Sequence, residues 1–478
     1  MGMTVTEPAS EPASEPASGP ASGPAQAKSA VRGRRDYPGP SFLAVPGLLR
    51  KLWFDRLAML TDAANEFGDV VRFAMGPKTL YFFNHPDHAK HVLSDNAANY
   101  HKGIGLAEAR RLMLGDGLLT SEGEVWKHQR RIIQPAFRRD RIAGFASAVT
   151  DAGEDLVSRL GARVGETVDL SEEMTRLTMS VLGKSLLAAD LSPLRMLGPA
   201  FEVAQDRAMF EMVSLGAVPL WLPLPRNLRF RRAKGQLEDA VEVLVSGRAH
   251  AGGRDGTDLL SMLAAAYSDD PDARKRWGVM RDELITILLA GHETTASTLS
   301  WTWYLLGSHP EAAAAMHAEA VQVLGDRTPG HEDLARLTFT TTVIQEAMRL
   351  YPPVWGLTRK SLAADVIDGY RVPAGADVMI SPYTLHRHPG FWPEPNEFRP
   401  ERFATSATPV TNRYAYIPFG AGPRVCVGSH LGMMEATLIA AMVARDFRFE
   451  LAPNARPEPE AMLSLRVRGG LPVKVCRA

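Results

Sequence analysis

The stretch PFGAGPRVCVG, residues 418–428, holds one of only two cysteines in a chain of 478 residues. Cys426 follows a glycine-rich loop and precedes VGSHLGMMEATLIAAMVA, which has the apolar spacing of a helix. We therefore expect its sulfur at a helix N-terminus, where backbone amides lower the pKa of a thiol and stabilise the thiolate. The alternative is an inert buried cysteine. Zinc is disfavoured, because no second cysteine or close histidine cluster accompanies Cys426.

The residues beside Cys426 suit contact with a large flat ligand. Gly422 and Gly428 let the backbone approach such a ligand closely. Phe419 is placed to pack on the ligand, and Arg424 to pair with a carboxylate at its edge. If the cysteine is not inert, the loop therefore predicts a binding site.

The composition narrows the classes of function. Lys plus Arg and Asp plus Glu both number 54, so no net charge favours nucleic acid or an anionic membrane. Two cysteines are too few for a disulfide framework, and the start of the chain lacks the pattern of a signal peptide. The apolar run 284–290 is far shorter than the ~20 residues of a membrane span. We expect a cytoplasmic protein with no transmembrane segment.

The N-terminal segment differs in composition from the rest. Residues 1–36 contain repeats of EPAS and GPAS, which bury too little apolar surface to order themselves, so we expect a disordered tail. From residue 37 to about 308 helical periodicity dominates, which predicts a mainly α fold. The proline-rich residues 220–227 are either a helix connection or a mobile lid.

Small β-sheets are expected to accompany the helices. Residues 68–84 contain two runs of β-branched and aromatic residues around a Gly-Pro pair, which predicts a strand pair. In residues 365–372, Asp368 and Gly369 separate two apolar runs, which is a strong hairpin pattern.

One long helix is expected over residues 282–308. Asp282 and Glu283 suit its positive end, and His309 with Pro310 ends it. Such a long, mostly apolar helix belongs in the core. Its middle, AGHETT, is nevertheless unfavourable in a buried helix. Glycine and threonine have low helix propensity, and a buried carboxylate is costly. We expect something polar to meet the helix there.

The spacing Phe-x-x-Gly-x-Arg-x-Cys-x-Gly, met by Phe419, Gly422, Arg424, Cys426 and Gly428, resembles the haem-binding loop of the cytochrome P450 family. The resemblance implies that Cys426 is the single protein ligand of the iron of haem b and supplies electron density for O–O cleavage. It also implies the P450 fold, mainly α with small β-sheets, with the haem between the long helix and the cysteine-loop helix. It covers residues 37–478, which we expect to form a single catalytic domain.

Four residues are implied to bind the haem propionates. WKHQRR resembles the family's Trp-x-x-x-Arg helix, and Trp126 and Arg130, four apart, lie on one helix face. Arg359 in LTRK occupies the place of a further propionate-binding arginine, with a solvated strand charge as the alternative. Lys102 is assigned to the same group.

Two other stretches resemble family motifs. AGHETT resembles the oxygen-binding stretch, in which Ala290 and Gly291 leave room for dioxygen while Glu293 and Thr294 are the catalytic acid and alcohol. A hydroxyl with a nearby carboxylate is what proton delivery to bound oxygen requires. The second set resembles the family's buried Glu-Arg-Arg network, whose implied role is structural, and consists of Glu346, Arg349 and Arg402.

The implied activity is NAD(P)H-driven monooxygenation of a lipophilic small molecule, such as a terpenoid, fatty acid or polyketide, with O2 as co-substrate. By analogy the substrate cavity is lined by residues 103–119, the region before Leu220, Ala290, residues 354–357 and residues 463–465. Two alternatives remain open. One is a peroxide-driven or non-oxygenating haem-thiolate enzyme, and the other is a haem-binding sensor or electron carrier, which has no use for Glu293 and Thr294.

The expected partners follow from the length of the chain and its local charge. The chain ends 52 residues after Cys426, which leaves no room for a fused reductase, so electrons are expected from a ferredoxin and its reductase. A basic run can meet an acidic ferredoxin or be a solvated helix face, and consists of Lys127, Arg130, Arg131, Arg138, Arg139 and Arg141. We expect a monomer with no nucleic-acid partner.

Overall fold

The computed structural model describes residues 32–33, 37–75, 78–194, 196–214, 218–250, 258–268, 271–407, 411–453 and 455–478. The tail expected over residues 1–36 therefore lies outside the described residues, apart from Arg32 and Gly33. Within the described part of the chain, no helix is both long enough and apolar enough to cross a bilayer.

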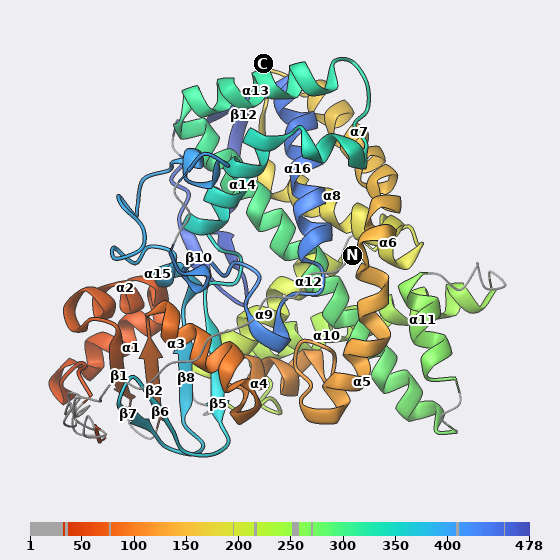
Figure 1. Cartoon of the computed structure of the whole chain (residues 1–478). Coiled ribbons are helices and arrows are strands. Elements are labelled where there is room, and N and C mark those ends of the chain that lie inside the picture. Colours follow the sequence, from red (N-terminus) through yellow and green to blue (C-terminus); the bar gives the residue numbers. More distant parts are fainter. Residues whose placement is uncertain are drawn as a thin grey trace, which may run out of the picture.

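Helices make up most of the molecule, and the mainly α prediction is confirmed (Figure 1). The α-helices are α1 (Val45–Phe54), α2 (Arg56–Phe67), α3 (Pro86–Lys90), α4 (Leu106–Ala109), α5 (Gly123–Ile133), α6 (Arg139–Gly144), α7 (Ala146–Gly161), α8 (Leu170–Leu182), α9 (Leu197–Val213), α10 (Pro225–His250), α11 (Leu259–Ala266), α12 (Ala273–Ser308), α13 (Pro310–Leu324), α14 (Thr338–Leu350), α15 (Pro382–Leu385) and α16 (Ser429–Asp446). Short 3-10 or π turns join several of them, including η2 (His91–Asp95) and η4 (Arg110–Leu114).

The strands form small sheets, as predicted. They are β1 (Val70–Met75), β2 (Lys78–Phe83), β3 (Tyr100–Lys102), β4 (Thr167–Asp169), β5 (Leu357–Ser361), β6 (Asp365–Ile367), β7 (Tyr370–Val372), β8 (Asp377–Ile380), β9 (Phe447–Leu451), β10 (Pro459–Ala461), β11 (Leu465–Val467) and β12 (Pro472–Arg477). One sheet has the order β1-β2-β8-β5-β3, another has the order β4-β12-β9, and two pairs are β6-β7 and β10-β11. In Figure 1 the first sheet lies with α1 and α2 at the lower left, beside the helical part.

Both strand predictions are confirmed. The pair expected in residues 68–84 is β1 and β2, which run antiparallel, while residues 76–77 between them lie outside the described part. The hairpin expected in residues 365–372 is β6 and β7. Asp368 and Gly369 both have a positive φ, 49° and 78°, which is the backbone conformation that a two-residue hairpin turn requires.

Helix α12 is longer than predicted at its N-terminal end. It begins at Ala273, because Asp272 caps it by accepting hydrogen bonds from the backbone N–H groups of Arg274 (2.9 Å) and Lys275 (3.3 Å). The predicted start at Asp282 was therefore wrong. The predicted end is confirmed, because Ser308 is its last residue.

The middle of α12 lies in the interior. The helix packs against α8, α14 and α16 (Figure 1). These four helices contribute side chains to one large apolar cluster. Trp301 on α12 and Leu438 on α16 are fully buried. The AGHETT segment is thereby placed between helices, next to the element that follows the cysteine loop.

The connection between α9 and α10 is tied to both helices. Arg207 of α9 is buried and donates hydrogen bonds to the carbonyl of Val218 (2.9 Å) and to Oδ1 of Asn227 (3.1 Å). Asn227 in turn donates to the carbonyl of Leu222 at 3.0 Å. Residues 220–224 therefore belong to a helix connection and residues 225–227 begin α10, while the mobility of this segment as a lid stays a prediction.

Candidate active site

Cys426 lies three residues before α16, at the end of a closed loop. Its backbone N–H donates to the carbonyl of Phe419 at 3.0 Å, which turns the loop back on itself. Burial raises the pKa of the Cys426 thiol, although the Gly428 N–H and the charge of Arg130 act in the opposite direction. The expectation of a lowered pKa was therefore wrong for the metal-free thiol, because desolvation outweighs the helix-end amides.

The glycines of the loop serve close packing. Gly422 has φ 68°, and a Cβ there would lie 1.8 Å from the carbonyl oxygen of Leu93 in η2, so this position needs glycine for its close approach to protein backbone. A Cβ on Gly428 would lie 4.0 Å from Sγ of Cys426 and 3.5 Å from the ring of Phe137. Gly428 is thus the glycine that lies beside the sulfur.

One face of α12 is open in the middle of an otherwise buried stretch. Ala290 is exposed although residues 282–289 before it are buried, and Thr294 is half-buried. The Thr294 hydroxyl donates to the carbonyl of Ala290 at 2.8 Å, which places both residues on one face. Gly291 does not share this space, because a Cβ there would lie 2.7 Å from Cδ1 of Leu182 on α8. Its small size allows α8 and α12 to pack.

Glu293 points toward α9 and not along the open face. Nε2 of Gln205 on α9 donates to both carboxylate oxygens, at 3.0 and 2.9 Å. Gln205 is 1% exposed. No motif in the sequence indicates Gln205, which lies 88 residues before Glu293.

Three cations gather around a single carboxylate. Oε1 of Glu122 accepts a hydrogen bond from the backbone N–H of Lys102 (2.5 Å), and its Oε2 pairs with Arg424. Arg359 on β5 lies opposite Lys102 on β3. Burial, together with the charge of Arg424, lowers the pKa of Arg359 to about 10, and burial with both arginines lowers the pKa of Lys102 well below its usual range. Because Arg359 is only 6% exposed, the solvated alternative is wrong.

Trp126 and Arg130 both reach the cysteine loop from α5. The guanidinium of Arg424 lies 4.0 Å from the centre of the Trp126 ring. Nη1 of Arg130 donates to the carbonyl of Val425 at 2.8 Å, next to Cys426. The structure thus brings together the two α5 residues, the loop and the cation cluster, although these come from distant parts of the chain.

The arrangement suits a haem. Cys426 is exposed in the loop that precedes α16, and Arg130 contacts the same loop. Ala290 is likewise exposed, although the residues of α12 before it are buried. Lys102, Arg359 and Arg424 outnumber their one carboxylate, so the site lacks negative charge of the kind that two propionates supply. Among the described residues, no group of three or more His, Cys, Asp or Glu side chains offers another metal site.

Comparison with known proteins agrees with this geometry. The family model of cytochrome P450 matches residues 38–477. The chain belongs to the cytochrome P450 family. It is 36% identical over 400 residues to cyclooctatin synthase of Streptomyces melanosporofaciens, covering 83% of this chain and 86% of that protein. It is 35% identical over 434 residues to cyclooctat-9-en-7-ol 5-monooxygenase of the same organism, covering 90% and 93%. A plant relative, LUTEIN DEFICIENT 5 of Arabidopsis thaliana, is 32% identical over 417 residues, covering 82% and 69%.

This P450 is therefore an oxidoreductase of the monooxygenase class. Its Glu-Arg-Arg network is formed as the sequence predicts. Arg349 binds both oxygens of Glu346, at 2.7 and 2.8 Å, and Nε of Arg402 lies 3.3 Å from Oε1. Glu346 and Arg349 are fully buried, so the pair is not a surface ion pair. Arg349 also donates to the carbonyl of Glu397 (2.9 Å), which ties α14 to the segment before the cysteine loop.

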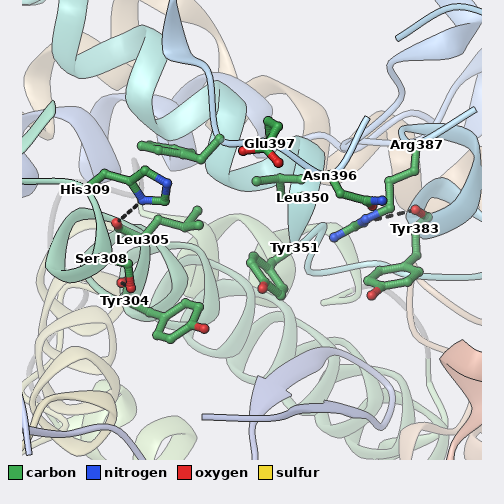
Figure 2. A pocket seen from close by; sticks show the side chains of 11 residues that line it. Tyr304, Leu305, Ser308, His309, Leu350, Tyr351, Tyr383, Arg387, Asn396 and Glu397 are labelled. Carbon is green, nitrogen blue, oxygen red and sulfur yellow. Dashed lines mark hydrogen bonds between the residues drawn. The ribbon is translucent and has the colours of Figure 1, made fainter. Parts of the chain in front are cut away.

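A separate hollow of about 370 Å³ lies at the C-terminal end of α12 in this P450 (Figure 2). Figure 2 shows the side chains that line it, among them Tyr304, Tyr351, Tyr383 and Arg387. Arg387 lies over the Tyr383 ring at 4.0 Å. None of the site residues predicted from the sequence lines this hollow.

Proposed function

We propose that this P450 inserts one oxygen atom of O2 into a lipophilic small molecule of terpenoid type, with electrons from a separate ferredoxin and its reductase. The two Streptomyces relatives, one named for cyclooctatin and one for cyclooctat-9-en-7-ol, favour this class over a fatty acid or a polyketide. The observation that carries the proposal is Cys426, an exposed thiol in a loop that Arg130 contacts and that contains Arg424 of the cluster with Lys102 and Arg359. The catalytic unit is residues 37–478, acting as a monomer in the cytoplasm.

Each predicted residue has a role in holding the cofactor. Cys426 would bind the iron, and the propionates would bind Trp126, Arg130, Lys102, Arg359 and Arg424. Phe419, Gly428 and Ala290 would border the ring. Bound haem supplies the activation of dioxygen at a thiolate-ligated iron. The raised pKa of the Cys426 thiol is no obstacle, because a metal displaces the proton of a coordinating thiol.

The chain's own residues would manage the protons. Thr294 lies on the open face of α12, where its hydroxyl could hold a proton on the side of the helix that would face the haem. Glu293 is the adjacent carboxylate that can pass protons on to it. This pair favours an oxygenase over a haem sensor or an electron carrier, neither of which needs protons delivered at that position.

Ligation by Cys426 is tested by substitution of each cysteine. The reduced wild-type protein with carbon monoxide should show the red-shifted Soret band of thiolate ligation. Cys426→Ser should lose this band, whereas Cys476→Ser on β12 should keep it, because Cys476 lies in the β4-β12-β9 sheet away from the loop. The reverse pattern would exclude Cys426 as the ligand.

The reaction is tested with labelled oxygen. Terpenoid hydrocarbons and alcohols that shift the Soret band are incubated with the P450, a ferredoxin, its reductase, NADPH and 18O2. We expect products that carry one 18O atom. A product that forms only when unlabelled hydrogen peroxide is added, and contains no 18O, would support the peroxide-driven alternative instead.

A further inference from the structure

The contact between Gln205 and Glu293 has one unusual feature. Gln205 donates through Nε2 to both oxygens of Glu293, but its own Oε1 has no hydrogen-bond partner in the described part of the chain. Gln205 is almost fully buried, and an unpaired acceptor is unfavourable in such a place. The hydrogen bonds to the carboxylate account for Nε2 of Gln205, but they leave Oε1 without a use in this arrangement.

The surroundings connect Glu293 to the surface. Arg466 on β11 pairs with Glu202 of α9 (3.1 Å) and with Glu460 of β10 (2.8 Å), and its charge acts on Glu293. Glu202 is largely exposed. Glu293 also interacts electrostatically with His292 on α12 itself, which is buried and hydrogen-bonded to the backbone carbonyl of Leu288. Glu293 therefore lies between a cluster that reaches solvent and the open face of α12.

The acid and the alcohol are held separately. Thr294 uses its hydroxyl proton on the carbonyl of Ala290, one turn back in α12. Glu293 is held by α9, through Gln205, and no hydrogen bond joins Glu293 to Thr294 in the described part of the chain. The orientation of the carboxylate is thus set by a neighbouring helix.

We propose that Gln205 is the residue that positions Glu293 in both of its protonation states. Nε2 of Gln205 donates to the carboxylate. Once a proton from the surface cluster forms an O–H bond on Glu293, a rotation of the amide lets the unpaired Oε1 accept that O–H. The proton then leaves toward Thr294, and the amide returns. This inference rests on the proton-delivering role proposed for Glu293.

The first test is Gln205→Leu, which keeps the size of the side chain and removes both its donor and its acceptor. Measured with holoenzyme, ferredoxin, reductase and NADPH, product per NADPH should fall several-fold, peroxide release should rise, and the solvent isotope effect on turnover should increase. Asp206→Asn is the matched control, because Asp206 lies next along α9 but pairs with Arg226 (3.2 Å). It should behave like the wild type.

The second test exchanges the two side chains. Gln205→Glu combined with Glu293→Gln keeps an amide against a carboxylate but moves the carboxylate to α9. The unfolding midpoint, lowered in each single variant, should return close to the wild-type value in the double variant. Product per NADPH should stay as low as in Glu293→Gln. If the product recovers together with the midpoint, the contact is only structural and the proposal is wrong.

The results separate this inference from the proposed function. If Glu293→Gln lowers product per NADPH and Gln205→Leu does not, the acid keeps its role and Gln205 loses its own. If Glu293→Gln and Thr294→Ala both leave product per NADPH unchanged, the proton-delivering pair itself is wrong.

Discussion

At the scale of single residues, Thr294 carries the most direct prediction. Its hydroxyl bonds the carbonyl of Ala290, a contact that a helix does not need, since alanine has the higher helix propensity. We therefore expect Thr294→Ala to fold, to bind haem and to keep the thiolate spectrum. The variant should release more hydrogen peroxide and make less product per NADPH. The measurement compares NADPH consumed, peroxide released and product formed. If the product formed per NADPH is unchanged, water or the substrate supplies the protons.

Residue motifs predicted part of this site, and its contacts explain why they did not predict the rest. Cys426 and Thr294 lie in short stretches whose chemistry is visible in sequence. Lys102 and Arg359 were both predicted as cofactor-binding residues, but their proximity was not, because it depends on the pairing of β3 with β5 more than 250 residues later. Gln205 meets Glu293 through the packing of α9, and a lone glutamine has no pattern by which to predict it.

At the scale of elements, the start of α12 shows how local chemistry can mislead. Asp282 and Glu283 have the composition of a helix N-terminus, yet they lie within the helix. They accept backbone N–H groups from a neighbouring loop, Asp116 at 2.8 Å and Leu118 at 2.9 Å. The sequence alone could not show that the helix begins after Asp272 and not at Asp282. That choice requires the knowledge that N–H groups of this loop donate to both carboxylates.

The buried Glu283 predicts how stability depends on pH. Burial raises its pKa to about 7, with Asp282 adding to the effect and the Leu118 N–H opposing it. Because the folded protein keeps this proton at a pH where the unfolded chain has lost it, the stabilisation is full below about pH 4.5 and is lost as the pH rises through 7. The loss amounts to roughly 3 kcal/mol of unfolding free energy.

The variant Glu283→Gln tests this. Glutamine keeps a carbonyl for the Leu118 N–H but cannot ionise, so unfolding midpoints of the variant should fall less than those of the wild type between pH 5 and pH 8. Glu283→Leu should be destabilised at every pH, because it leaves the Leu118 N–H unpaired. Like Glu283→Gln, it should lack the part of the pH dependence that Glu283 causes. A parallel decline in wild type and Glu283→Gln would assign the pH dependence to other groups.

At the scale of the whole molecule, the helices were easier to predict than their assembly. Hydrophobic spacing gave the α class and the two hairpins, because both are local. The sheet order β1-β2-β8-β5-β3 was not predicted, because β2 pairs parallel with β8 almost 300 residues away. That pairing nevertheless helps to bring Arg359 to the cofactor site, since β5 lies between β8 and β3.

Several residues of the basic run around α5 and α6 already have partners within the protein, which the sequence does not indicate. Lys127 pairs with Glu124, Arg138 with Asp140, and Arg130 bonds the cysteine loop. Arg131 and Arg139 are exposed and form no ion pair within the described residues. Of this basic run, we therefore expect Arg131 and Arg139 to attract an acidic ferredoxin most strongly, because no ion pair in the described part of the chain neutralises their charges.

We expect the transfer of electrons from ferredoxin to depend on the charges of Arg131 and Arg139. NADPH alone should give no turnover, and an acidic ferredoxin with its reductase should restore it, less well as salt screens exposed charges. Arg131→Gln with Arg139→Gln should raise the ferredoxin concentration needed for half-maximal turnover and flatten its salt dependence. Arg229→Gln with Arg232→Gln, the same charge change on exposed α10, is the control and should do neither. If both pairs weaken turnover equally, the ferredoxin responds to net charge, and a docking site on α5 and α6 is excluded.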